Sequence, residues 1–307
     1  MTNLIDCIGN TPVVKLRSVL KNRRLSIWAK LENLNPAGSI KDRASIAMLM
    51  RAEREKAIQP GKTTLVEASS GNTAIGLALY CRVRGYNLVI VMPEDTAKEK
   101  IELIKAFKGQ VVITDAALGL RGSTEKAREI ERENLNSYLL DQFRNTADIK
   151  IHREETAAEI KKQVPGHLDA FVCGVGSGGT AMGLGAELKK IYPGCKLVVV
   201  EPTECSILSG GKEGRHGICG ISPGFVPEKL DTAVIDRVCT VSTDDARECA
   251  VAIAREEGIL VGISSGASLH AALEISEEFG DGAQILVTFC DSGEMYLGSS
   301  LYDQKTV

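Results

Sequence analysis

A lysine at the start of a predicted helix is the residue of this chain best placed for covalent chemistry. The segment from Asn35 to Arg43 reads Asn-Pro-Ala-Gly-Ser-Ile-Lys-Asp-Arg, and an amphipathic helix is expected from Ile40 to Lys56. Lys41 then lies in the first helical turn, where exposed backbone N–H groups disfavour a positively charged ammonium. A neutral lysine amine can form a Schiff base with an aldehyde. The alternative is an ordinary solvated lysine, so the rest of the chain must decide.

Two loops rich in glycine and hydroxyl groups could bind anions, and each follows a predicted strand and precedes a predicted helix. Residues 69–73 read Ser-Ser-Gly-Asn-Thr, and donors of this kind at a helix N-terminus suit a carboxylate. Residues 174–180 read Gly-Val-Gly-Ser-Gly-Gly-Thr, in which the glycines let backbone N–H groups approach a phosphate. Parallel α/β folds bind ligands beyond the carboxyl ends of strands, where both loops are expected. A third turn, residues 262–267, is better explained by a plain helix cap.

The second loop also fits a dinucleotide-binding pattern. Gly174, Gly176 and Gly179 satisfy G-x-G-x-x-G, and Glu201 lies about 20 residues farther on, where such folds place a carboxylate for a ribose hydroxyl. A nicotinamide-dependent oxidoreductase is therefore an alternative. It leaves Lys41 and residues 69–73 without a role, whereas a phosphorylated aldehyde cofactor would use all three features.

Alternating strands and helices must position these loops. Short apolar runs predict strands at residues 63–67, 87–92, 111–114, 170–175, 196–201 and 284–289. Amphipathic runs predict helices at residues 74–83, 98–107, 123–132, 181–191, 244–257 and 268–278. This alternation is typical of a doubly wound parallel α/β fold, and 307 residues are enough for two such domains.

Composition argues against several classes of function. The net charge is −3, so no nucleic-acid partner is expected. No apolar run is long enough to span a membrane and no signal-peptide pattern begins the chain, so a cytoplasmic protein is expected. The nine cysteines form no CxxC pair, so no metal site is expected. Five lie in apolar patterns typical of buried thiols in a reducing compartment: Cys81, Cys173, Cys195, Cys239 and Cys249.

Taken together and in this order, the motifs resemble those of the cysteine synthase (O-acetylserine sulfhydrylase) family of fold-type II pyridoxal-phosphate enzymes. The shared motifs lie at residues 8–12, 30–32, 35–43, 69–73, 92–94, 142–143, 176–180, 201–202, 210–211, 224–225, 262–266 and 291–294. The resemblance implies two doubly wound, three-layer α/β domains of the tryptophan-synthase-β-like class. A smaller, mobile domain is expected at residues 36–147, and a larger domain at residues 1–35 and 148–307.

The resemblance also implies a role for each matching residue. Lys41 holds the cofactor, pyridoxal 5'-phosphate, as an internal aldimine and later removes the substrate α-proton. Asn72 hydrogen-bonds the pyridoxal phenolate oxygen, and Ser264 faces the pyridine nitrogen, where a hydroxyl in place of a carboxylate suits β-elimination. The phosphate is bound by Gly176, Ser177, Gly178, Gly179 and Thr180. The substrate carboxylate is held by Ser69, Ser70, Asn72, Thr73 and Gln142.

The activity implied by the resemblance is that of a transferase, a pyridoxal-phosphate-dependent cysteine synthase. It would form L-cysteine from O-acetyl-L-serine and sulfide through an aminoacrylate intermediate. Members of the family are commonly homodimers, and some bind the C-terminal tail of serine acetyltransferase, so both are candidate partners for this chain.

Several departures from the family pattern leave the substrate open. The usual Gly-Pro-His is Gly-Arg-His at residues 214–216, the usual Gly-Ile-Gly ends in Ser222, and Met295 replaces an arginine. Residues 145–149 also lack both prolines of the usual Asn-Pro-x-Asn-Pro. Segment 205–229 borders the substrate entrance in relatives, and Arg215 could pair with a phosphate, which would make O-phosphoserine the substrate. The motifs are also compatible with a cysteine desulfhydrase or lanthionine-type lyase, a cystathionine β-synthase-like enzyme, or an inactive scaffold.

Overall fold

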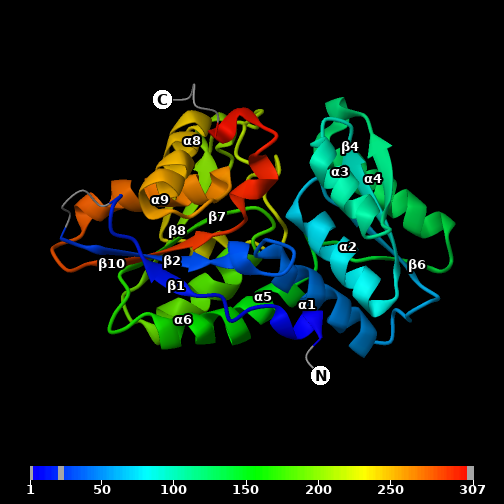
Figure 1. Ribbon diagram of the computed structural model, residues 1–307, viewed down its shortest axis with the longest axis horizontal. Coiled ribbons are helices and arrows are strands. Elements are labelled where there is room, and N and C mark those ends of the chain that lie inside the picture. Colours follow the sequence, from blue (N-terminus) through cyan, green and yellow to red (C-terminus); the bar gives the residue numbers. More distant parts are fainter. Residues whose placement is uncertain (1–2, 20–23, 303–307) are drawn as a thin grey trace. The chain divides into compact units, whose positions relative to one another are not determined.

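The computed structural model describes residues 3–19 and 24–302, which form two compact units. The first unit comprises the described part of Met1–Ile8 together with Lys41–Asp148, and the second comprises the described parts of Gly9–Ile40 and Ile149–Val307. Each unit contains one sheet of mainly parallel strands with helices packed on it (Figure 1). The predicted α/β fold with two sheets is therefore confirmed.

The sheet of the first unit has four parallel strands in the order β5-β4-β3-β6. Its strands are β3 (Thr64–Ala68), β4 (Asn87–Pro93), β5 (Gln110–Thr114) and β6 (Ser137–Leu139), and its helices are α1 (Lys41–Arg54), α2 (Asn72–Arg84), α3 (Lys98–Ala106) and α4 (Gly119–Glu133). Residues 88–92 of β4 are all buried, as expected for a central parallel strand covered on both faces. On one face Ala127 of α4 packs against Val66 and Val89.

The sheet of the second unit has six strands in the order β1-β2-β10-β7-β8-β9, of which only the edge strand β1 is antiparallel. The strands are β1 (Val13–Lys15), β2 (Ser26–Leu31), β7 (Ala170–Gly174), β8 (Lys196–Pro202), β9 (Arg237–Val241) and β10 (Gln284–Phe289). The helices are α5 (Ala147–Ile151), which crosses the boundary between the units, α6 (Ala157–Gln163), α7 (Ala186–Ile191), α8 (Thr243–Ala252) and α9 (Ile263–Ile275). Single π-helical turns occur at η4 (His152–Thr156), η5 (Ala181–Gly185) and η8 (Ile253–Glu257).

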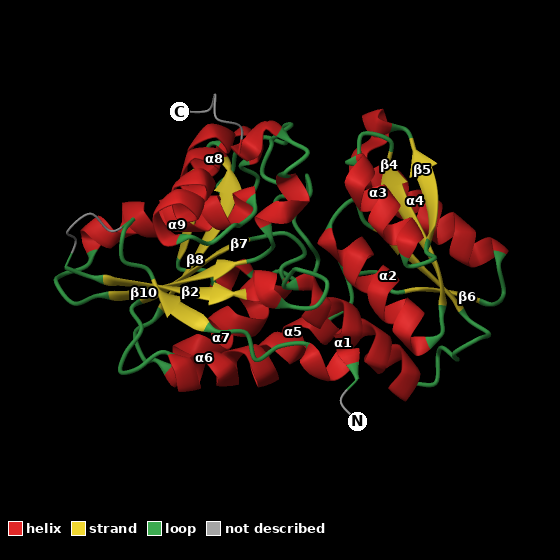
Figure 2. Ribbon diagram, viewed as in Figure 1, coloured by secondary structure: helices red, strands yellow, loops and turns green. Residues whose placement is uncertain are grey.

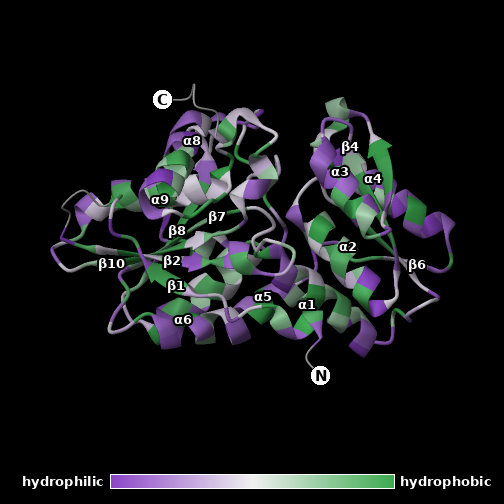
Figure 3. Cartoon of the chain, viewed as in Figure 1, coloured by the Kyte–Doolittle hydropathy of each residue, from purple (hydrophilic) through white to green (hydrophobic). Residues whose placement is uncertain are grey.

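Helices cover both faces of this second sheet, which makes the unit three-layered (Figure 2). Side chains alternate between the faces of a strand, so Val172 and Phe171 of β7 belong to different cores. The core around Val172 includes residues of α8 and α9, and the core around Phe171 includes residues of α6, η5 and α7. The strands are accordingly coloured mostly as hydrophobic in Figure 3, whereas the helices carry both colours.

Most predicted elements have counterparts, and the differences have local causes. The helix expected to begin at residue 268 begins at Ile263, because Gly262 is its N-cap and Gly266 fits inside it. A Cβ on Gly266 would lie 2.0 Å from the carbonyl oxygen of Ala246 in α8, so this glycine allows the two helices to approach. The short edge strands β1, β6 and β9, and the strand β2, were not among the predicted elements. Cys249 is only partly buried, whereas the other four predicted buried cysteines are buried.

The division into units differs in three places from the domain bounds predicted from the sequence. Residues 3–8 and Asp148 group with the first unit, and residues 36–40 group with the second. Residues 38–40 are held by the backbone after β10: Ile40 N–H donates to the Cys290 carbonyl (2.8 Å), and Ser292 N–H donates to the Gly38 carbonyl (3.0 Å). The mobility predicted for the smaller domain stays a prediction.

Candidate active site

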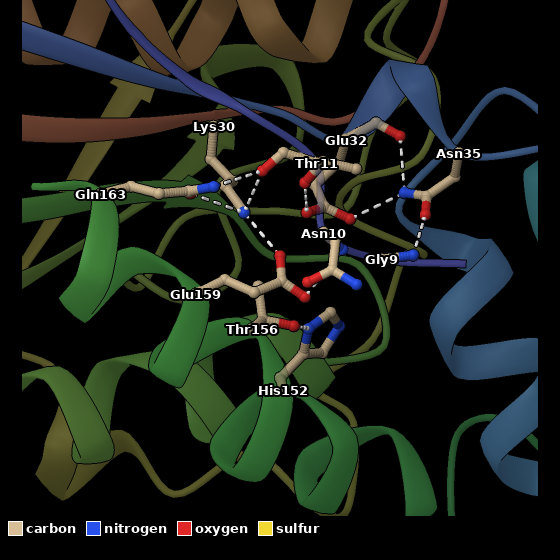
Figure 4. A network of polar contacts seen from close by, with 10 residues as sticks. All are labelled: Gly9, Asn10, Thr11, Lys30, Glu32, Asn35, His152, Thr156, Glu159 and Gln163. Carbon is tan, nitrogen blue, oxygen red and sulfur yellow. Dashed lines mark hydrogen bonds and ion pairs between the residues drawn. The ribbon is translucent and has the colours of Figure 1, made fainter. Parts of the chain in front are cut away.

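Lys41 begins α1, one residue later than the predicted helix start at Ile40, so it lies in the first helical turn, and the loop that leads into it is held firmly. Besides the backbone bonds of residues 38–40, Asn35 anchors the start of the loop. Its side-chain oxygen accepts from Gly9 N–H (2.9 Å), and its amide nitrogen donates to the Glu32 carboxylate (2.9 Å) (Figure 4). Glu32 is buried and also accepts from the Thr11 hydroxyl (2.7 Å). The sequence before the candidate nucleophile is therefore fixed at several points.

The residue after Lys41 is tied to α2 by a buried hydrogen bond. The Tyr80 hydroxyl donates to Oδ2 of Asp42 at 3.0 Å, and both side chains are buried. Burial raises the pKa of Tyr80 well above its ordinary value, and the neighbouring Asp42 carboxylate raises it further. Tyr80 therefore stays a neutral donor that holds the first turn of α1 against α2.

The loop at residues 69–73 joins β3 to α2, and the structure brings it together with Gln142. The Thr73 hydroxyl donates to Oε1 of Gln142 (2.8 Å), and Nε2 of Gln142 donates to the Ala68 carbonyl (2.9 Å). Asn72 is the first residue of α2, after Gly71 as the N-cap, so backbone N–H groups at this helix N-terminus face the same loop. Hydroxyls, an amide and helix N–H groups together make a site suited to a carboxylate.

The glycine-rich loop lies in the second unit, between β7 and the π-helical turn η5. Gly178 has φ +89°, in the left-handed region that favours glycine, and Ser177 is buried. A Cβ on Gly176 would lie 2.4 Å from the Gly220 carbonyl oxygen, so another backbone segment packs directly on this residue. The loop ends at Thr180, at the start of a helical segment. These features fit a phosphate held by backbone N–H groups and hydroxyls, as pyridoxal phosphate requires.

Ser264 is buried near the start of α9, at the same edge of the sheet as the glycine-rich loop. Its helix is anchored just after β10, because Gly262 N–H donates to the Asp291 carbonyl at 3.1 Å. β10 and β7 are parallel neighbours, so the backbone that follows each strand emerges at the same, carboxyl edge. Two of the predicted cofactor-binding features therefore converge on one edge within this unit.

His152 is a candidate site residue that the sequence reasoning missed. It is buried, with Nδ1 3.0 Å from the Thr156 hydroxyl and Nε2 3.4 Å from the hydroxyl of Thr180 in the glycine-rich loop. A Cβ on Gly183 would lie 2.6 Å from Cβ of His152, so these two segments are in close contact. The four-residue spacing of His152 and Thr156, which places both on one face of a helix, was the available signal.

Glu201 does not have the environment expected of a ribose ligand. Its Oε2 accepts from Leu208 N–H (2.8 Å), and its Oε1 accepts from both the backbone N–H (2.8 Å) and the hydroxyl (2.6 Å) of Ser209. The side chain is 1% exposed. Both carboxylate oxygens of Glu201 therefore hold the turn that follows β8. Glu201 has a structural role there, and its spacing from the glycines does not indicate a dinucleotide site.

A buried ion pair lies within the second unit. Lys30 is 0% exposed, and its ammonium donates to the Thr11 carbonyl (2.5 Å), to Glu159 (2.6 Å) and to Gln163 (3.0 Å). Figure 4 shows the network running from α6 through Lys30 and Thr11 to Glu32 and Asn35. A buried ammonium with three acceptors is satisfied, so this lysine has a structural role.

Two further features bear on the class of protein. Among residues 3–19 and 24–302, no group of three or more His, Cys, Asp or Glu side chains could hold a metal ion. No helix in the described part of the chain is both long and apolar enough to cross a membrane.

Comparison with known proteins identifies the family. The profile of the pyridoxal-phosphate dependent enzyme family matches residues 4–291. A cysteine synthase of Staphylococcus aureus strain Mu50 is 42% identical over 98% of this chain and 96% of its own length. The solved structure of an O-ureido-L-serine synthase is 37% identical with a TM-score of 0.94, over 99% of this chain and 96% of that chain. The O-acetylserine dependent cystathionine beta-synthase of Helicobacter pylori is 36% identical with a TM-score of 0.92, over 98% and 99% of the two chains. This chain belongs to the pyridoxal-phosphate dependent enzymes and, within them, to the cysteine synthase family, and its cofactor is pyridoxal 5'-phosphate.

Proposed function

We propose that the protein forms L-cysteine from O-acetyl-L-serine and sulfide by replacing the acetate on the substrate β-carbon. The observation that carries the proposal is the contact of Thr73 with Gln142 at the N-terminus of α2, which brings together two of the residues proposed to bind the substrate carboxylate. The similarity to cysteine synthases over nearly the whole chain supports it.

The proposed roles follow from the chemistry of each side chain. Lys41 binds the cofactor covalently and then takes the α-proton of the substrate. Residues 176–180 hold the cofactor phosphate, Asn72 hydrogen-bonds the phenolate oxygen, and Ser264 faces the ring nitrogen with a neutral hydroxyl. When bound, pyridoxal phosphate withdraws electrons from the substrate α-carbon, which makes that proton acidic.

The substrate carboxylate is oriented by residues of the first unit. Ser69, Ser70, Asn72 and Thr73 bind it, together with Gln142, whose amide is held by Thr73 and by the Ala68 carbonyl. A fixed carboxylate places the leaving group on the β-carbon reproducibly, which is the contribution that orientation makes to the rate.

O-Acetylserine is favoured as the donor because one similar enzyme is described as O-acetylserine dependent. The similar enzymes are named for different products: cysteine, O-ureido-L-serine and cystathionine. Their similarity alone therefore does not identify the nucleophile, and sulfide is part of the proposal. Arg215 is exposed in segment 205–229, and the O-phosphoserine alternative depends on it. We propose further that the protein is a cytoplasmic homodimer and that a serine acetyltransferase C-terminal peptide is a candidate partner.

The test supplies the holoenzyme with O-acetyl-L-serine, first without and then with sulfide, and measures acetate and cysteine. We expect a stoichiometric burst of acetate without sulfide and steady formation of both products with it. O-Phospho-L-serine, L-serine and L-cysteine are offered in parallel. Release of phosphate alone, or of sulfide from cysteine alone, would replace the proposed substrate with O-phosphoserine or with cysteine.

The variant Arg215→Ala distinguishes O-phosphoserine from O-acetylserine as the substrate. A selective loss of phosphate release in this variant would assign Arg215 to a substrate phosphate. An equal effect on acetylserine turnover would discard that pairing. Size-exclusion chromatography with light scattering, with and without the acetyltransferase peptide, tests the proposed assembly.

A further inference from the structure

Part of the irregular segment 205–229 packs directly against the glycine-rich loop. A Cβ on Gly174 would lie 2.4 Å from Cγ2 of Ile221, and a Cβ on Gly176 would lie 2.4 Å from the Gly220 carbonyl oxygen. Ser222 N–H donates to the Val175 carbonyl at 2.7 Å, between these two glycines. The backbone of residues 220–222 and that of residues 174–176 are therefore in contact.

Ser222 is held in this position by three hydrogen bonds. In addition to its N–H bond, its hydroxyl donates to the carbonyl of the buried Cys205 (2.9 Å), and its own carbonyl accepts from Nε2 of His216 (3.0 Å). Ser222 has φ +47°, a left-handed conformation that costs free energy for a residue other than glycine. The hydroxyl bond to Cys205 is an interaction that glycine, the usual residue of the family at this position, cannot make.

These bonds fix Val175, the residue of the glycine-rich loop that immediately precedes residues 176–180. Val175 N–H donates to the Val200 carbonyl of β8 at 3.2 Å, while its carbonyl accepts from Ser222. The peptide units on both sides of Val175 are thus set from outside the loop. The orientation of the Gly176 N–H, the first N–H of residues 176–180, follows from the same peptide plane that carries the Val175 carbonyl.

We propose that Ser222 is a positioning residue for the phosphate of the cofactor. Its hydroxyl ties residues 220–222 to Cys205, at the start of segment 205–229, and its N–H fixes the peptide between Val175 and Gly176. His216 completes the arrangement by donating to the Ser222 carbonyl. The inference rests on the proposed binding of the cofactor phosphate by residues 176–180.

The test compares two ligands that differ only in the phosphate. The full-length protein is resolved from its cofactor and titrated with pyridoxal 5'-phosphate and with pyridoxal, and the dissociation constants are measured by absorbance and fluorescence. For Ser222→Ala we expect pyridoxal phosphate to bind about three- to tenfold more weakly, the value of one hydrogen bond, with pyridoxal unchanged. Ser222→Gly loses the same hydroxyl but relieves the left-handed backbone, so it should be affected less.

Variants of His216 provide an independent check that leaves Ser222 intact. His216→Ala removes the donor to the Ser222 carbonyl and should weaken pyridoxal phosphate binding, whereas His216→Gln offers an amide N–H at a similar distance and should restore it. Ser209→Ala is the matched control. It also removes a hydroxyl from segment 205–229, but that hydroxyl bonds Glu201 and the Ser206 carbonyl, not the glycine-rich loop.

The outcomes separate this inference from the proposed function. If the wild-type protein binds pyridoxal as tightly as pyridoxal phosphate, the phosphate role of residues 176–180 fails, and this inference fails with it. If the wild-type protein prefers pyridoxal phosphate over pyridoxal, and Ser222→Ala and His216→Ala show the same preference, only the role of Ser222 is overturned. An equal loss of both ligands in these variants would also overturn it, because a general structural effect would then explain the result.

Discussion

Thr73 and Gln142 are joined by a 2.8 Å hydrogen bond from hydroxyl to amide oxygen, although they are 69 positions apart in the chain. The Ala68 carbonyl can only accept, so the Gln142 amide turns its nitrogen toward Ala68 and its oxygen toward the Thr73 hydroxyl, which donates. The two residues follow β3 and β6, parallel strands whose C-terminal ends lie side by side, so the proposed carboxylate site depends on both strands.

Replacing Thr73 by valine tests this dependence with little change in shape. Thr73→Val removes the hydroxyl that holds Gln142, so we expect KM for O-acetylserine to rise about tenfold, because Gln142, a proposed carboxylate ligand, loses the hydrogen bond that orients its amide. Thr73→Ser keeps the hydroxyl and should stay close to wild type. Steady-state kinetics with O-acetylserine and sulfide measure both variants. An unchanged KM in Thr73→Val would remove Thr73 from the substrate site.

Lys41→Ala should abolish cysteine formation and covalent attachment of the cofactor. No other group in the proposal supplies the amine or takes the α-proton. Borohydride reduction followed by mass spectrometry should find pyridoxal phosphate on the peptide containing Lys41 in the wild type and on no peptide in the variant. Lys62→Ala, which alters an exposed lysine, is the control. Turnover retained in Lys41→Ala would end the proposed role.

Ser264→Asp should change the visible spectrum of the bound cofactor and slow cysteine formation by more than about tenfold. A carboxylate facing the ring nitrogen would hold a proton there, whereas the wild-type hydroxyl does not. Ser264→Ala keeps the position neutral and should retain most of the activity. If the spectra of the Asp variant and the wild type coincide, Ser264 does not face the ring.

Tyr80→Phe should lower the free energy of unfolding by about 1–3 kcal/mol, because it leaves the buried Asp42 carboxylate short of a donor. Tyr86→Phe is a matched control: the Tyr86 hydroxyl donates to Glu53 at 2.9 Å in a less buried site, so its loss should cost less. Urea unfolding monitored by circular dichroism measures both. A larger effect of Tyr86→Phe would contradict the importance assigned to the bond between Tyr80 and Asp42.

Stability should fall as the pH rises above 9, because burial raises the pKa of the Cys81 thiol to about 12. In the unfolded chain this thiol ionises near its ordinary value of 9.0, while in the folded protein it keeps its proton. Above pH 9 the folded state then binds more protons than the unfolded state. The stability that the protonated thiol contributes is therefore lost progressively as the pH rises from 9.0 to about 12.

Urea unfolding between pH 8 and pH 11 measures the slope of the free energy of unfolding against pH. Cys81→Ala should make the slope shallower, whereas Cys7→Ser, at an exposed cysteine, should leave it unchanged. A slope identical in the wild type and Cys81→Ala would show that other groups cause the alkaline instability.

Much of the fold could be predicted from the sequence, because the buried strands are apolar runs and the loops between strands and helices have a distinctive composition. Apolar runs such as residues 87–92 are unambiguous, and glycine with hydroxyl residues between a strand and a helix marks the ligand-binding edge. The edge strand β1 escaped prediction because three partly exposed residues give no pattern. The assignment of Glu201 as a possible ribose ligand failed because its partners, Leu208 and Ser209, lie in a turn that spacing alone does not predict.

The position of β10 inside its sheet determines which of the two sheets can be completed first during synthesis. β10 lies between β2 and β7, so a strand made late in translation must enter between two strands made earlier. Until then β2 and β7 each present an unpaired edge, the kind of edge that recruits other chains. The sheet of the first unit draws its four strands from within residues 64–139 and can close long before. The sheet of the first unit can therefore be completed once residue 139 has been made, whereas that of the second unit stays incomplete until residues 284–289 are added.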